Sequence, residues 1–155
     1  MFTNDPSQLR TFYISAWQKF NNQEPLSPLE KQVSQVIYEH PEYHNFFNNL
    51  DNNLDINLDK YNNQSEHTNP FLHLGLHLGV RDQIALDNPK GIQNIYNTLI
   101  NKSCNQQNIN NSIIYHEIEH SIMEILMDEL MLSQKYKKDF DTTTYLNKLN
   151  QLLFK

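Results

Sequence analysis

Apolar residues recur at intervals of three and four along most of this chain, which is the period of an amphipathic α-helix. The first such stripe follows Asp5 and Pro6, an N-cap residue and a proline at the first helical position. It comprises Leu9, Phe12, Tyr13, Ala16, Trp17 and Phe20. A stripe of this kind normally faces the core, so we expect these side chains to be buried and not to form a ligand platform.

Capping residues and prolines mark the helices that follow. Ser27-Pro28-Leu29-Glu30 is a capping box. The helix that it opens must stop before Pro41, because the residue preceding a proline disfavours the helical conformation. Cap signals and apolar periodicity predict further helices over residues 42–50, 69–86, 89–102 and 111–134, and after residue 141. Residues 51–68 are rich in Asn and Asp and are predicted to form mostly a loop.

These elements define the expected fold class. Strand patterns are nearly absent, apart from a short alternation at Leu54, Ile56 and Leu58 that has no partner strand. The sequence therefore predicts an all-α protein, a compact helical bundle of five to seven helices. With 155 residues, the chain is expected to form a single domain over residues 1–155.

Composition and charge exclude several classes of protein. A formal charge of −6 argues against a nucleic-acid-binding surface. No stretch approaches the roughly 18 apolar residues of a membrane span, and the N-terminus lacks the features of a signal peptide. Cys104 is the one cysteine, which excludes an internal disulfide and a Cys-rich zinc module. We expect a cytoplasmic protein that contacts neither nucleic acid nor membrane, and its small-molecule or protein partner is unknown.

Three pairs of histidines lie four residues apart. These pairs are His40/His44, His73/His77 and His116/His120. Seven histidines placed at random in the chain would give roughly 0.27 such pairs. Residues four apart on a helix point the same way, so two imidazoles at this spacing can share one metal ion. The sequence therefore predicts a metal site.

The predicted ligands follow from the helix faces. An angular step of about 100° per residue places His116 and His120 on one apolar face with Ile113, Met123 and Met127, and Glu117 at its border. His73 and His77 occupy a narrow arc of the preceding helix with Val80 and Ile84. Pro41 separates His40 from the helix that carries His44, so we prefer His44 as the ligand of that pair. The predicted metal ligands are His44, His73, His77, His116, His120 and Glu117.

Imidazoles with carboxylates suit a divalent transition metal, and we expect Zn or Fe. The leading hypothesis is an internal metal site, with no activity assigned to it. Two alternatives stay open. In the first, His116-Glu117-Ile118-Glu119-His120 matches the H-E-x-x-H pattern of a zinc-dependent peptidase or hydrolase, with Glu117 as the catalytic residue that activates water. In the second, the protein is a metal-free helical interaction module with a buried histidine network.

The histidine motifs also carry a resemblance. The segments 69–77, 87–92 and 116–120, with His40-Pro41-Glu42-Tyr43-His44 before them, resemble a group of small proteobacterial proteins. These proteins form the domain-of-unknown-function family number 1841. The resemblance covers most of the chain from Leu29 to Tyr145 and implies an all-helical fold. It implies no activity or substrate.

Overall fold

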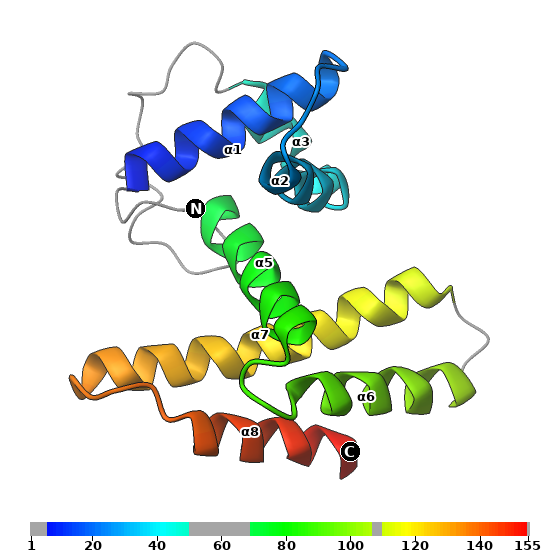
Figure 1. The fold of residues 1–155 in the computed structure, drawn as a ribbon, viewed down its shortest axis with the longest axis vertical. Coiled ribbons are helices and arrows are strands. Elements are labelled where there is room, and N and C mark those ends of the chain that lie inside the picture. The colour runs from blue at the N-terminus through cyan, green and yellow to red at the C-terminus, as the bar shows by residue number, and fades with distance from the viewer. Residues whose placement is uncertain (1–5, 50–68, 107–109, 155) are drawn as a thin grey trace. The chain divides into compact units, whose positions relative to one another are not determined.

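The computed structural model describes residues 6–49, 69–106 and 110–154. In these ranges every regular element is helical, with seven α-helices and no strand. In chain order they are α1 (Pro6–Asn21), α2 (Pro28–Tyr38), the 3₁₀ helix η1 (Pro41–Tyr43), α3 (His44–Asn48), α5 (Pro70–Leu86), α6 (Ile92–Gln106), α7 (Asn111–Lys135), α8 (Thr142–Gln151) and the 3₁₀ helix η2 (Leu152–Phe154) (Figure 1). The all-α fold and the expected number of helices are confirmed. The loop and the short alternation predicted between residues 51 and 68 lie outside the described residues.

The predicted capping residues begin the helices. Ser27 and Glu30 form the expected capping box at the start of α2: the Ser27 backbone N–H donates to Glu30 Oε1 at 2.9 Å, and the Glu30 N–H donates to Ser27 Oγ at 3.2 Å. Asp141 caps α8 through a 3.0 Å bond from the Thr144 N–H. One boundary differs. Helix α6 was expected from residue 89 but begins at Ile92, because the Asp87 carboxylate accepts from the N–H of Gly91 at 2.9 Å.

Contacts divide the chain into two compact units, residues 1–78 and 79–155, and helix α5 runs across the boundary between them. The expectation of a single domain over residues 1–155 stays a prediction. No helix in the described ranges is long and apolar enough to cross a membrane.

The first unit has an aromatic core between α1, α2, α3 and the first turns of α5. Helices α1 and α2 pack directly on each other. The expected burial of the α1 stripe is confirmed at Trp17, which is 4% exposed and donates from Nε1 to Asn48 Oδ1 at 2.9 Å. The buried core comprises Tyr13, Ile14, Ala16, Trp17, Val33, Val36, Ile37, Phe47, Phe71, Leu74 and Leu78. Lys19 and Glu30 join α1 to α2 by a 2.8 Å ion pair.

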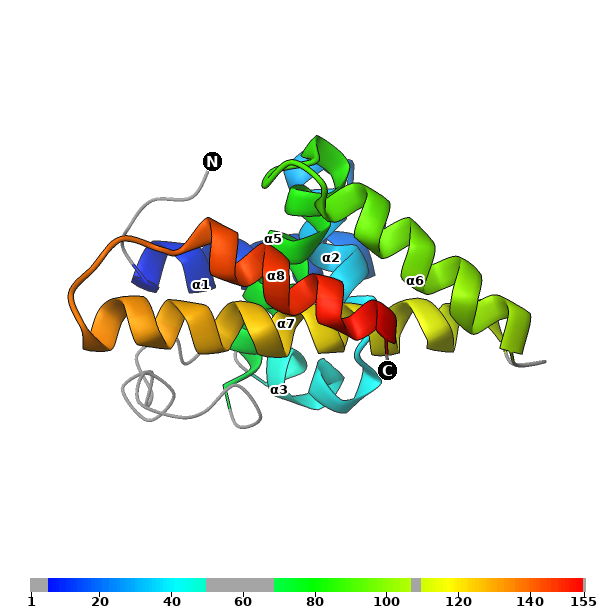
Figure 2. The same cartoon turned by 90° about the horizontal axis from the view of Figure 1, so that it is seen from below.

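The second unit is built around α7, the longest helix. Helices α6 and α8 both lie along α7 and contact each other, α6 beside its first half and α8 beside its second half (Figures 1 and 2). Two polar contacts hold the end of α5 in this unit. Arg81 Nε donates to Glu119 Oε1 of α7 at 2.8 Å, and Tyr145 Oη of α8 donates to Gln83 Oε1 at 2.7 Å.

The buried face of α7 differs in part from the expected one. The expectation paired Met123 with Ile113 and placed Glu117 at the border of the buried face. Met123 is buried, but Ile113 is 50% exposed and Glu117 is exposed. The buried residues of α7 are Ile114, Ile118, Glu119, Ile122, Met123, Leu126 and Glu129. Apolar residues occur on more than one side of this helix, so its period alone did not single out the packed side.

Candidate metal centre

His40 is positioned by the end of helix α2. Pro41 disfavours a helical conformation for the residue before it, and His40 leaves the helix with φ −121° and ψ 74°. Its side chain turns back, so that Nδ1 lies 2.7 Å from the carbonyl oxygen of Val36. A carbonyl oxygen can only accept, so Nδ1 carries the hydrogen. In neutral His40 the other ring nitrogen, Nε2, therefore presents a lone pair.

His73 and His77 are positioned by the start of helix α5. Asn69 caps this helix, and its Oδ1 accepts from the N–H groups of Phe71 at 3.1 Å and Leu72 at 3.3 Å. The helix then stacks the two imidazoles one turn apart, with ring centroids 4.8 Å apart and 3.2 Å between the two Nε2 atoms. His77 has no exposed surface, whereas His73 is half-buried.

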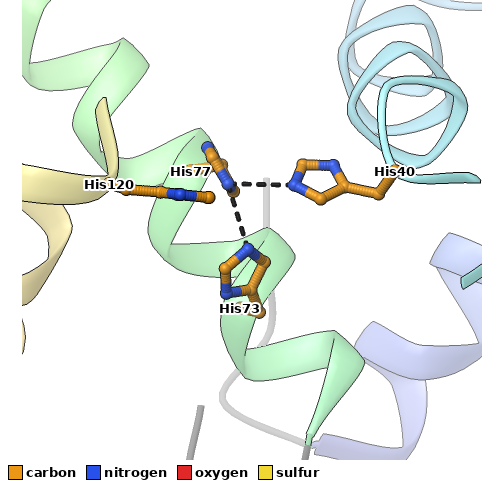
Figure 3. Close-up of side chains that lie close together, drawn as sticks. All are labelled: His40, His73, His77 and His120. Carbon is orange, nitrogen blue, oxygen red and sulfur yellow. Dashed lines mark hydrogen bonds between the residues drawn. The ribbon is translucent and has the colours of Figure 1, made fainter. Parts of the chain in front are cut away.

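The three imidazoles converge inside the first unit. Nε2 of His40 lies 3.0 Å from Nε2 of His77, and one ring nitrogen of each histidine lies within 4.8 Å of the others (Figure 3). Two imidazoles bound to one tetrahedral zinc ion at 2.0–2.1 Å have their nitrogens about 3.3–3.4 Å apart. The observed separations of 3.0 and 3.2 Å differ from that value by a few tenths of an ångström. The three residues are called the histidine cluster below.

The nitrogen positions suit a shared cation better than a chain of hydrogen bonds. Nε2 of His77 faces the Nε2 atoms of both His40 and His73. In a neutral imidazole each ring nitrogen has either one hydrogen or one lone pair. A single hydrogen on His77 Nε2 cannot point along both directions. A cation can take a lone pair from all three nitrogens at once.

An aromatic ring covers part of the cluster. The Tyr43 ring stacks on His40 with centroids 5.7 Å apart and planes 13° apart, and meets His73 edge-on at 5.9 Å. His40 itself is 1% exposed. Such packing fixes the orientation of the two imidazoles and keeps water away from His40, which is how a binding site is pre-organised.

His44 lies apart from the histidine cluster. Its Nε2 is 3.0 Å from the Ile37 carbonyl oxygen, and its ring packs on Trp17 at a centroid distance of 4.9 Å. The structure thus brings His40 to His73 and His77, where we had preferred His44. Pro41 does separate the two residues as expected. It does so by folding the His40 side chain back toward α2, and a sequence pattern does not show where that turn lies relative to α5.

The other predicted ligands belong to the second unit. His116 and His120 stack on α7 with ring centroids 4.2 Å apart, as their spacing predicts. Glu117 between them is exposed. The buried carboxylate of this motif is Glu119, at 6% exposure, and it is bound to Arg81. Whether His116, His120 and Glu117 bind metal stays a prediction.

Fold and site together define an all-α protein with a buried cluster of three imidazoles. The chain belongs to the family described as Domain of unknown function (DUF1841), whose family model matches residues 5–151. The resemblance seen in the histidine motifs is thereby confirmed. No curated protein and no solved structure matches the chain.

Proposed function

We propose that this protein binds a divalent transition-metal ion, Zn or Fe, through Nε2 of His40, His73 and His77. The observation that carries the proposal is the contact between His40 and His77, at 3.0 Å. The bond between His40 Nδ1 and Val36 leaves a lone pair on His40 Nε2, directed at that contact. Metal-bound histidines usually donate their second N–H to a carbonyl or carboxylate in this way, which fixes the tautomer.

Burial and ligand chemistry support the same proposal. Three polar rings in an apolar core are costly unless their nitrogens are satisfied, and coordination satisfies one nitrogen of each. Imidazole suits Zn, Fe, Ni and Cu, and three histidine ligands are found in catalytic zinc sites. The metal identity within this class and any reaction at the metal are matters for experiment.

Metal content and binding test the proposal. Protein purified without an immobilised-metal column should contain close to one equivalent of metal, and His40→Ala/His77→Ala should contain almost none. His44→Ala is the matched control, because it removes another imidazole of the same unit that lies outside the cluster. If folded wild type and folded His44→Ala both bind neither zinc nor iron, the proposal is wrong. The cluster is then a metal-free histidine network.

A zinc-dependent hydrolase is a second candidate function. It is favoured by the stacked pair His116 and His120 and by the exposed Glu117 beside them, which water and a substrate can reach. Glu117→Gln should then keep the metal and lose the hydrolysis of a general peptide substrate. An unchanged rate in that variant, or no hydrolysis by metal-loaded wild type, would reject this candidate.

A further inference from the structure

We infer that this protein binds a second copy of itself through the C-terminal half of helix α7, as a two-fold symmetric dimer. The inference concerns the second unit and does not depend on the histidine cluster. Helix α8 lies along this half of α7, and a groove of about 420 Å³ opens beside the two helices (Figure 1). The groove is lined by Asp128, Met131, Leu132, Lys135 and Lys148.

Two large apolar side chains of α7 are exposed at this groove. Met131 is 56% exposed and Leu132 is 36% exposed. A single exposed apolar residue is ordinary on a protein surface, whereas neighbouring ones that line a groove indicate an interaction site. Methionine is enriched in protein–protein interfaces, because its flexible thioether adapts to the surface that it meets. These two residues are therefore suited to be the centre of an interface.

One charge of each sign flanks the apolar pair on the same face of α7. Asp128 and Lys135 are seven residues apart, so they point in nearly the same direction and are separated by about 10 Å along the helix axis. Both residues are exposed. The midpoint between them falls between Met131 and Leu132. This face of α7 thus has a negative end, an apolar centre and a positive end.

Such a face is complementary to itself. A two-fold axis through the midpoint makes the α7 helices of two copies antiparallel. Asp128 of each copy then lies opposite Lys135 of the other, and the apolar pairs meet at the axis. A parallel pairing would bring like charges together, so the charges select the antiparallel one. Exposed ion pairs add little affinity, so the apolar centre must provide most of it.

The remaining cation of the groove does not disturb this balance. Lys148 of α8 is already bound through Nζ to Oε1 of the buried Glu129. The charges left to a partner are those of Asp128 and Lys135, which are placed symmetrically about the apolar pair. Symmetry of this kind is required for contact between two identical surfaces, and binding of a different protein does not require it. The charge pattern therefore favours a second copy of this chain as the occupant.

Charge reversal tests the pairing. Sedimentation velocity of the full chain over about a hundredfold range of concentration should show a monomer–dimer equilibrium for the wild type. Asp128→Lys and Lys135→Asp each replace two ion pairs of the dimer by two like-charge pairs, and each should raise the dissociation constant at least about tenfold. Asp82→Lys is the matched control and should dimerise like the wild type, because it makes the same change of charge at an exposed residue of α5.

A mixture of the two variants provides the sharper test. In a heterodimer of Asp128→Lys with Lys135→Asp, both contacts again join opposite charges. The mixture should therefore associate about as tightly as the wild type, a result that a folding defect in either variant would not produce. The inference is overturned by a wild type that stays monomeric over the whole range, by single variants that dimerise like the wild type, or by a mixture that associates no better than its components.

Discussion

Nε2 of His40 meets Nε2 of His77 at 3.0 Å across 37 residues of chain. The contact joins the end of one helix to the middle of another, and neither residue has more than 1% of its surface exposed. The lone pair on His40 Nε2 needs a partner at this contact, either the Nε2–H of His77 or a cation that both nitrogens bind. We propose a bound metal ion as the physical reason for this contact, and the following predictions test that account and the fold around it.

Chelation should destabilise the wild type at neutral pH. A ligand at a hundred times its Kd stabilises the folded state by about 2.7 kcal/mol, so its removal should lower the melting temperature by about 5–10 °C for a chain of this length. His40→Ala/His77→Ala should melt at the same temperature with and without EDTA. Equal melting of wild type in both buffers would count against the metal.

The same melting experiment tests the predicted second pair. If His116 and His120 are ligands, as the sequence predicts, His116→Ala/His120→Ala should also lose part or all of the EDTA effect. If that variant keeps the full wild-type response to EDTA, His116 and His120 are not metal ligands. The proposal of a three-histidine site in the first unit is unaffected by that result.

Pro41 should matter to metal affinity although it is no ligand. In Pro41→Ala, helix α2 can continue through residue 40, and His40 would then lose the bond from Nδ1 to the Val36 carbonyl. Loss of such an orienting contact typically weakens metal binding about 10–100-fold. Competition against a chromophoric chelator measures this affinity. Pro28→Ala, at the other end of the same helix, is the matched control, and an equal loss in both variants would contradict this role of Pro41.

Two neighbouring glutamates of α7 should differ sharply in their effect on stability. Glu119 is buried and bound to Arg81 at 2.8 Å, whereas Glu117 is exposed. Glu119→Gln weakens a charge-assisted bond to Arg81 and should reduce the free energy of unfolding by about 1–3 kcal/mol. Glu117→Gln should change it by less than about 0.5 kcal/mol. Urea unfolding of the two variants provides the comparison, and equal values would contradict the observed packing of α7.

Glu30 should contribute a pH-dependent part of the stability. Its ion pair with Lys19, together with the bond from the Ser27 N–H, lowers the pKa of Glu30 from 4.5 to about 2. A carboxylate with a lowered folded-state pKa stabilises the fold above its unfolded pKa. That stabilisation is lost as the pH falls from about 4.5 to about 2.

Glu30→Gln isolates this effect, because glutamine can still form the capping box. Wild type should be more stable than Glu30→Gln at pH 7, and the difference should shrink as the pH falls through that window. Urea unfolding at a series of pH values measures it, with the exposed Glu42→Gln as control. A difference between wild type and Glu30→Gln that does not vary with pH would show that the charge of Glu30 is not its source.

Local signals were enough to predict most of the fold. Ser27 and Asp141 each cap a helix through a bond from a backbone N–H three residues further on. The start of each helix is therefore determined by residues that are close in the sequence. Pro41 likewise acts on its immediate neighbour. The start of α6 was placed three residues early because Asp87 caps it across a turn, and the residues between gave no sign of where that turn ends.

The site was less predictable, because tertiary contacts choose among equivalent local patterns. His73 and His77 could be paired from their spacing on one helix. His40 could not be joined to them, since that contact depends on how α2 and α5 pack in the first unit. Which of Glu119 and Glu117 is buried also depends on which apolar side of α7 is covered. Glu119 pairs with Arg81, which lies 38 residues away in the sequence, so the pattern within α7 does not show it.

The ligands of the bound metal can be counted directly. X-ray absorption fine structure of the Zn- or Fe-loaded full chain should show at least three imidazole nitrogens about 2.0–2.1 Å from a zinc ion, with no sulfur ligand. The imidazole count should fall in His40→Gln and His77→Gln and stay unchanged in His44→Gln. A coordination shell of oxygen or sulfur without imidazole, or an imidazole count that His40→Gln and His77→Gln do not alter, would contradict the metal site proposed for these histidines.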